Sequence, residues 1–328
     1  MAKYKDIRGS NIQDIEGDPT GIEGQVFYNT VSKTLKGITS SPATGSWATG
    51  GNLNTARYQL GGAGTQTAGL GFGGNPPTSG TNATEEYDGS SWANGGNLGT
   101  ARRAVEGNGT QTAGLAVGGH PGRTDTEEYD GSSWTSGGSL SGGRKEGATG
   151  GTQTAAFYAT GQLAPGAHPG QTEEYDGSSW TSGGTMGTGR YGPGGTGTQT
   201  AGLAFGGANN SPYSVYTNTE EYDGSSWTAG GALGTARYGM APAQNGTQTA
   251  ALSAGGAPGA TAITATEGYD GSSWSTLANL GTGTYRLAGA GTQAAGLAFG
   301  GGPAPSVKNT TQEFTGPAIN STVTIDTD

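Results

Sequence analysis

Side chains that could perform acid–base or nucleophilic chemistry are scarce in this chain of 328 residues. It contains two histidines, His120 and His168, and no cysteine. No motif combines a nucleophile, a base and an orienting group. We therefore predict no catalytic site, no metal site and no cofactor, and hence a protein that is not an enzyme.

Arginine recurs at a regular spacing. The chain has six tryptophans, and one arginine follows each of the first five by ten residues and the last by twelve. A guanidinium group can bind a carboxylate through two parallel hydrogen bonds. A recurring glutamate could accept such bonds between neighbouring strands or sheets, namely Glu86, Glu128, Glu174, Glu221 and Glu313. The arginines of this column are Arg57, Arg102, Arg144, Arg190, Arg237 and Arg286.

The arginines belong to a repeat that tryptophan marks most clearly. Successive tryptophans stand 42 to 47 residues apart, and most close the same phrase, first complete at residues 84–92 as Thr-Glu-Glu-Tyr-Asp-Gly-Ser-Ser-Trp. A repeat of this length is typical of propellers and solenoids. The tryptophans are Trp47, Trp92, Trp134, Trp180, Trp227 and Trp274. The matching tyrosines are Tyr87, Tyr129, Tyr175, Tyr222 and Tyr269.

Each copy contains four short segments that we predict to be strands. In the first complete copy they are residues 57–60, 67–72 and 84–87, followed by a strand that begins at 91–93. Asp-Gly after the tyrosine favours a tight turn, because glycine readily adopts a positive φ. Four antiparallel strands make one propeller blade. We expect the tryptophans and tyrosines to form the apolar core between neighbouring blades.

The two ends of the repeated region complete one blade between them. The last copy supplies three strands, the third at residues 311–314, but no tryptophan follows it. Trp47, in turn, has no preceding strands of its own. We predict an all-β fold, a six-bladed β-propeller with four antiparallel strands per blade, whose sixth blade takes its fourth strand from around Trp47. Closing the ring in this way removes two free sheet edges.

The order of residues in each copy resembles the kelch repeat. The shared features are an arginine opening the first strand, Gly-Gly closing the second, Tyr-Asp closing the third and a tryptophan in the fourth, over about residues 42–316. The resemblance implies a β-propeller with arginines near the central channel, where in some kelch proteins they contact acidic ligands. Two interpretations of the arginine column stay open, pairing with glutamate or contact with a ligand.

Composition limits the partners of the chain. Glycine makes up 69 residues, and leucine, isoleucine, valine and phenylalanine together about a ninth, a level that alone would suggest disorder. The fixed offsets between aromatic residues argue against disorder. A net charge of −10 opposes binding to nucleic acid. No segment is long and apolar enough for a membrane span, and residues 1–8 lack the apolar region of a Sec signal.

The connections between the second and third strands differ from copy to copy. All six should emerge on one face of the disc, and variable loops on a fixed scaffold are typical of a recognition surface. We predict a binding face there. Its candidate residues are His120, Arg123, His168, Tyr213, Tyr216 and Lys308.

The chain ends lie outside the predicted propeller of residues 42–316. We expect an extended arm at 1–24 that orders on a partner, a β-hairpin at 25–41 and a tail at 317–328. The phrase Gly-Gln-Val-Phe-Tyr-Asn at 24–29, ahead of the glycine-rich copies, resembles virion proteins of marine bacteriophages, notably those that infect cyanobacteria. This resemblance implies a tail or tail-fibre component that is located in the virion and attached to other virion proteins.

Three functions stay open at this point. The first is a non-enzymatic virion protein whose loops recognise a host-surface glycan or protein. The second is a purely architectural decoration of the tail or capsid. The third is a sialidase-like glycosidase, because residues 88–92 are similar to the Asp-box of sialidases although one residue shorter. That third function would need three arginines and a Tyr-Glu pair in one pocket.

Overall fold

The computed structural model describes residues 13–15, 26–32, 34–39, 44–76, 79–163, 166–210, 213–302, 306–317 and 321–324. Every regular element in these residues is a β-strand. The chain divides into two compact units, Ser46–Gly316 and a second unit made of Met1–Gly45 with Pro317–Asp328.

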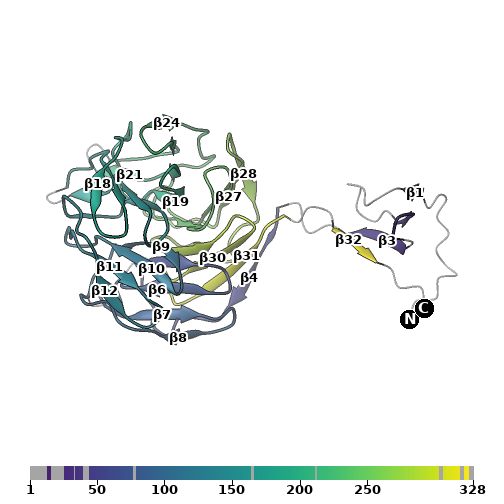
Figure 1. Ribbon diagram of the computed structural model, residues 1–328, viewed down its shortest axis with the longest axis horizontal. Helices are drawn as coiled ribbons and strands as arrows, with labels where there is room; N and C mark the ends of the chain where they lie inside the picture. Colours follow the sequence, from purple (N-terminus) through teal and green to yellow (C-terminus); the bar gives the residue numbers. More distant parts are fainter. Residues whose placement is uncertain are drawn as a thin grey trace. The chain divides into compact units, whose positions relative to one another are not determined.

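The larger unit is a six-bladed β-propeller, and each blade is a sheet of four antiparallel strands (Figure 1). Blade 1 contains β5 (Gly61–Gly64), β6 (Gly69–Phe72), β7 (Thr84–Tyr87) and β8 (Trp92–Asn94). Blade 2 contains β9 (Glu106–Thr110), β10 (Ala113–Val117), β11 (Thr126–Tyr129) and β12 (Trp134–Ser136). Blade 3 contains β14 (Ala148–Gly151), β15 (Ala156–Ala159), β17 (Thr172–Tyr175) and β18 (Trp180–Ser182).

The remaining blades follow the same order. Blade 4 contains β19 (Gly194–Thr198), β20 (Ala201–Phe205), β23 (Thr219–Tyr222) and β24 (Trp227–Ala229). Blade 5 contains β25 (Ala241–Pro242), β26 (Ala251–Ala254), β27 (Thr266–Tyr269) and β28 (Trp274–Leu277). Blade 6 contains β29 (Ala288–Gly291), β30 (Ala295–Phe299), β31 (Thr311–Thr315) and β4 (Ser46–Gly50).

Blade 6 is assembled from both ends of the propeller sequence, and this confirms the predicted closure. In Figure 1 the purple β4 lies beside the yellow β31. The two strands pair antiparallel, with Phe314 opposite Trp47. Their rings pack with centroids 5.0 Å apart. The fourth strand at each of the other blades comes instead from a hairpin, in which Gly89 of blade 1 takes a φ of +90°.

The predicted start of the first strand is wrong. Residues 57–60 were expected in the strand, but β5 begins at Gly61. The reason is local, because Gln59 has a φ of +53° and so leaves the extended conformation. Two short two-stranded sheets also form outside the blades: β13 (Arg144–Lys145), which precedes blade 3, pairs with β16 (Gln162–Leu163), and β21 (Ala208–Asn210) pairs with β22 (Tyr213–Val215) in one loop of blade 4.

The second unit contains one four-stranded sheet in the order β1-β2-β3-β32. Its strands are β1 (Gln13–Ile15), β2 (Val26–Asn29), β3 (Thr34–Thr39) and β32 (Ser321–Thr324). β2 and β3 form an antiparallel hairpin, and β32 pairs with β3. Segments predicted as an extended arm and a tail therefore each contribute a strand here. The other residues of 1–24, namely 1–12 and 16–24, lie outside the described part of the chain.

Two side chains of the repeat, a tryptophan and a glutamine, bind each blade to the one before it. The indole Nε1 of Trp134 donates to Thr84 Oγ1 of blade 1 at 2.9 Å, and all six tryptophans make this bond to the preceding blade. Gln111 donates to the carbonyls of Gly69 and Tyr87. The glutamine of the Thr-Gln pair that precedes each second strand therefore joins neighbouring blades.

Glycine is required where a neighbouring turn touches the chain between blades. A Cβ on Gly138 would lie 2.2 Å from the carbonyl oxygen of Ser178 in the next blade's hairpin turn. The same holds for Gly51, Gly96, Gly184 and Gly231. Blade 6 has no such turn, since its last two strands come from opposite chain ends. Ala278 stands at the equivalent position there, which the absence of the turn explains.

Candidate binding site at the channel mouth

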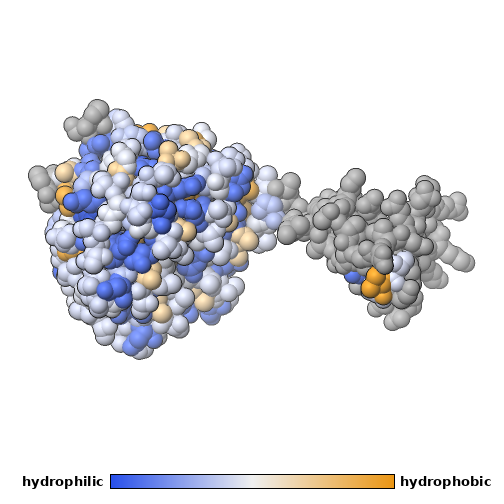
Figure 2. All heavy atoms as spheres, turned by 45° about the horizontal axis from the view of Figure 1, so that its top comes forward, coloured by the Kyte–Doolittle hydropathy of each residue, from blue (hydrophilic) through white to orange (hydrophobic). Residues whose placement is uncertain are grey.

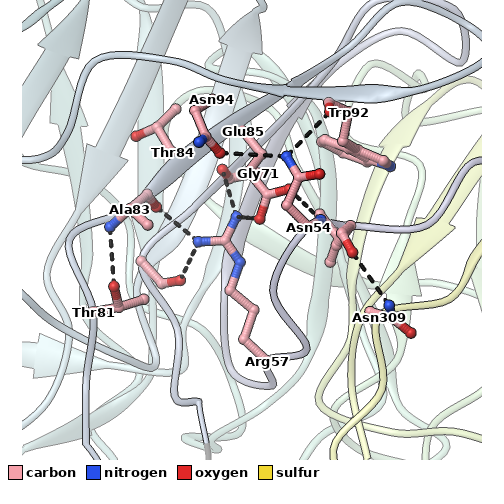
Figure 3. A network of polar contacts seen from close by, with 12 residues as sticks. Asn54, Arg57, Gly71, Thr81, Ala83, Thr84, Glu85, Trp92, Asn94 and Asn309 are labelled. Carbon is pink, nitrogen blue, oxygen red and sulfur yellow. Dashed lines mark hydrogen bonds and ion pairs between the residues drawn. The ribbon is translucent and has the colours of Figure 1, made fainter.

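The repeated arginines are buried inside their own blades, as Figure 3 shows for Arg57. Arg57 donates to Glu85 Oε1 at 3.0 Å and to the carbonyls of Gly71, Gly73 and Ala83. Glu85 Oε2 accepts from the backbone N–H of Asn54 at 2.6 Å. Four further pairs repeat this arrangement, Arg102–Glu127, Arg144–Glu173, Arg190–Glu220 and Arg237–Glu267. All five arginines are at most 1% exposed.

The expected glutamate column is the wrong one of two adjacent columns. Successive residues of a strand point to opposite faces. Glu85 therefore meets Arg57 within the blade, whereas Glu86 faces the next blade and accepts a hydrogen bond from the Tyr129 hydroxyl. The other such pairs are Tyr87–Glu313, Tyr175–Glu128, Tyr222–Glu174 and Tyr269–Glu221. Burial is the main cause that raises the pKa of these five phenols to about 12, and the glutamate bond adds to it.

The arginine–glutamate pair is absent from blade 6, and the tyrosine–glutamate pair is absent between blades 5 and 6. In each case both partners are replaced. The residue equivalent to Arg57 is Thr284, and the residue equivalent to Glu85 is Gln312, so arginine and glutamate are both missing. Between blades 5 and 6, Gly268 offers no carboxylate and Phe314 has no hydroxyl. Phe314 packs instead in an apolar cluster with Leu252 and Leu277. We call this contact between blades 5 and 6 the apolar seam.

Arg286 does not belong to the buried arginine set. It stands two residues after Thr284, and its φ of +55° matches that of Gln59, two residues after Arg57. The different spacing from tryptophan in the last copy therefore reflects a different structural position. There the side chain lies over the ring of Tyr285, 5.4 Å from its centroid, in a cation–π contact.

The residues equivalent to Gln59 form a closed ring of six backbone hydrogen bonds. The N–H of Gln59 donates to the carbonyl of Arg286 at 2.8 Å, and each following blade repeats the bond to the blade before it. All six positions have positive φ. They are Gln59, Ala104, Glu146, Gly192, Gly239 and Arg286. Four non-glycine residues in this conformation are strained, and such strain is concentrated at functional sites.

This backbone ring divides the channel into two cavities. Gln59, Ala104, Glu146 and Arg286 line both of them. On one side lies a small cavity of about 60 Å³, which also reaches Glu106 at the start of β9. Burial is the main cause that raises the pKa of Glu106 well above its usual range, and the charge of Glu146 adds to it.

On the other side lies a polar cavity of about 280 Å³, which we call the channel cup. It opens on the face that carries the loops between second and third strands, since His120, Gln162 and Asn210 of those loops line it. Three cations, Arg103, Lys145 and Arg286, stand in its wall with one carboxylate, Glu146. The cup is therefore positively charged, although the chain as a whole carries −10.

The charges of the channel cup are only partly compensated. Glu146 accepts a hydrogen bond from the side-chain amide of Gln59. Lys145 Nζ lies 3.3 Å from His120 Nδ1. Among the described residues, no ion pair involves Arg103, Lys145 or Arg286. Burial, then the neighbouring Arg103 and Lys145, lower the pKa of His120, so that imidazole is neutral near pH 7.

The predicted face residues do not all gather in one place. His120 lines the channel cup, and His168 packs on Tyr191, a wall residue of the cup, with ring centroids 5.1 Å apart. Tyr213 is 54% exposed on β22, and in the view of Figure 2 the described surface is mostly hydrophilic, with apolar residues scattered over it. Tyr216 is half-buried at the end of that loop.

Two of the predicted cations, Arg123 and Lys308, make their contacts outside the channel cup. Arg123 pairs with Asp125, and Lys308 donates to the carbonyl of Gly283 at 2.7 Å. Neither residue lines the channel cup. The cations that do line it, Arg103 and Lys145, were missed because they follow the buried arginines directly. Their signal was a departure from the repeat, since the other four copies have Tyr58, Tyr191, Tyr238 and Tyr285 at this position.

Comparison with known proteins identifies no family for this chain. No protein-family model matches the chain, and no curated protein matches it either. The fold is consistent with the kelch resemblance, which therefore rests on the repeat and the six-bladed ring alone. Among the described residues, no helix is long and apolar enough to cross a membrane. The same residues contain no cluster of three or more acidic or histidine side chains that could hold a metal ion.

Proposed function

We propose that this chain is a recognition protein without catalytic activity, a phage tail or tail-fibre component that presents its loop face to a host surface or to another protein. The observation that carries the proposal is the channel cup. Side chains from five blades converge there, from Tyr58 of blade 1 to Arg286 of blade 6. A concave site with several converging polar groups is the usual form of a ligand site.

The buried arginines support a binding role over a glycosidase role. A sialidase-like site would need three free arginines, whereas Arg57, Arg144 and Arg190 are all held by glutamates inside their blades. The virion assignment rests on the resemblance of residues 24–29 to marine phage proteins. Labelling phage particles with antibody against this chain and locating the label by electron microscopy tests that assignment.

Binding of the labelled full-length protein to host cells tests the recognition role. We expect it to bind, and to lose binding when residues 208–218 are replaced by the shorter connection 120–125. The matched control replaces Ser90 with alanine, because this turn lies at the opposite end of blade 1 from the cup. Equal binding by all three proteins would contradict recognition through the loop face.

A purely architectural role is the second candidate. The sheet of the second unit supports it, because strands from both chain ends, β1 and β32, meet in one separate unit suited to attachment. Under this role, removing residues 1–24 should prevent incorporation into particles, while replacing 208–218 should change nothing.

A further inference from the structure

We infer that the channel cup binds the anionic group of an acidic saccharide, with Arg103, Lys145 and Arg286 as the cationic contacts. This inference names the ligand class for the proposed recognition function and rests on it. The repeated arginines that pair with glutamate inside the blades take no part, since they are buried.

The charge of the cup is the first step. Three cations face one carboxylate, and the carboxylate is already bonded to Gln59. These side chains are half-buried, and like charges gathered in one cavity repel one another unless a counter-charge joins them. An anion would supply that charge, and hydrogen bonds between ionised partners are the strongest that a protein side chain makes.

The second step is that these cations are departures from the repeat. Arg103 and Lys145 stand where the other four blades have tyrosine, and Arg286 stands where the other blades have Gln59, Ala104, Glu146 and two glycines. No demand of the blade fold requires a cation at these positions, because the remaining copies fold without one. Arg286 also keeps a strained φ of +55° where blades 4 and 5 use glycine. A binding role accounts for charges that the scaffold does not need.

The third step concerns the rest of the ligand. The wall of the cup also holds the phenol-bearing residues Tyr58 and Tyr191 and the amides of Gln162 and Asn210. Amides and hydroxyls both donate and accept hydrogen bonds, which suits the several hydroxyls of a sugar. A volume of about 280 Å³ lies just below the range of ~300–1,000 Å³ usual for small-molecule sites, so the cup fits one terminal sugar residue.

Titration calorimetry on the full-length protein tests the inference. The probes are a glucuronate-terminated oligosaccharide, its 6-sulfated and 6-phosphorylated glucose counterparts and the neutral, carboxyl-reduced form. We expect the anionic probes to bind and the neutral form to bind at least about tenfold more weakly, as expected for hydrogen bonds to charged groups. The ranking of the three anions identifies the oxyanion. Binding should weaken as salt is added.

The repeat supplies substitutions that the fold already accepts. Arg103→Tyr and Lys145→Tyr restore the residue found in four other blades, and Arg286→Gln introduces the residue that Gln59 shows to fit the same φ. Each should weaken the anionic probe about tenfold. Arg123→Gln is the control, because Arg123 pairs with Asp125 outside the cup. Unchanged thermal denaturation shows that each variant is folded.

The outcomes separate this inference from the proposed function. Equal affinity for anionic and neutral probes, affinity unaffected by the three variants, or no binding of any probe overturns the inference. If labelled protein still binds host cells in those cases, recognition stands with a different ligand class. If the probes bind as expected but host cells are not bound, the anion site stands and the recognition function falls.

Discussion

At the scale of single residues, blade 6 shows which parts of the repeat depend on one another. Thr284 and Gln312 replace a buried arginine and its glutamate together, and Gly268 and Phe314 remove an acceptor and its donor together. Removing one partner of a buried charged pair leaves the other without compensation, whereas removing both does not. The paired losses indicate that the surviving pairs are coupled.

This coupling can be measured in blade 4. Glu220→Gln leaves Arg190 buried beside a neutral group and should lower the free energy of unfolding by roughly 3–5 kcal/mol. Arg190→Thr leaves Glu220 uncompensated and should cost a similar amount. The double variant recreates the pair found in blade 6, so its loss should fall short of the sum of the single losses by at least about 1 kcal/mol. Urea denaturation followed by tryptophan fluorescence gives these values, and strict additivity would show that the pair is not coupled.

The phenols between blades predict a loss of stability in alkali. Burial and the bond to glutamate raise the pKa of Tyr87 from 10.0 to about 12. A folded-state pKa above the unfolded value means that the neutral phenol stabilises the fold fully below pH 10 and progressively less as the pH approaches 12. The midpoint of urea unfolding should therefore fall between pH 10 and 12. Tyrosinate absorbance recorded over the same range should rise with unfolding, and tyrosines ionising freely at pH 10 without unfolding would refute the buried geometry.

The exposed Asp-Gly-Ser-Ser turns predict a smaller effect in acid. Hydrogen bonds from Ser90 and Ser91 lower the pKa of Asp88 from 3.8 to about 2. A depressed folded-state pKa gives stability that is present above pH 3.8 and is lost as the pH falls through 2. Urea midpoints measured from pH 5 to 2 should decline modestly, and Asp88→Asn should flatten part of that decline. An unchanged profile in this variant would mean that the carboxylate bonds contribute nothing to stability.

At the scale of elements, the hairpin turn of one blade determines which residue fits at the position of the neighbouring blade that contacts the turn. Gly138→Ala would place a methyl group 2.2 Å from the Ser178 carbonyl, so blades 2 and 3 must separate or the turn must move. We expect a loss of several degrees in the melting temperature. Gly259→Ala is the matched control, because nothing lies within 4 Å of its added carbon. Equal melting of the two variants would show that the turn adapts without cost.

The strands were predictable to different degrees. The third strand, 84–87, was predicted with its observed bounds, because it lies in the repeated phrase and ends at the Asp-Gly turn. The first strand was not predicted correctly. The positive φ of Gln59 belongs to a ring of backbone hydrogen bonds that forms only among six blades, so no local sequence pattern indicates it. Likewise, the choice between Glu85 and Glu86 as partner of Arg57 depends on which face of the strand looks inward. The cations of the cup carried a sequence signal, their departure from the tyrosine of the other copies, but their convergence in one cavity depends on closure of the ring.

At the scale of the whole molecule, the pairing of β4 with β31 holds the ring shut. A protein of residues 44–317 contains every strand of the propeller, whereas one of residues 51–317 lacks the fourth strand of blade 6. We expect the longer protein to unfold in one cooperative transition. The shorter one exposes the edge of β31 and the buried ring of Phe314, so it should melt earlier and associate. Calorimetry and light scattering distinguish the two, and identical behaviour would mean that closure by β4 is not needed.

The apolar seam also limits how such a chain can change its number of repeats. Near-identical phrases favour unequal recombination, which adds or deletes one copy at a time. In a duplicate blade inserted between blades 2 and 3, the tyrosine hydroxyl could donate to a glutamate of blade 2, and the tryptophan could donate to a threonine of blade 2. At the seam the same insertion would bring a tyrosine hydroxyl against Gly268, which has no acceptor to offer. We therefore expect copies of the repeat to be gained or lost among the first four blades, and blades 5 and 6 to be kept together.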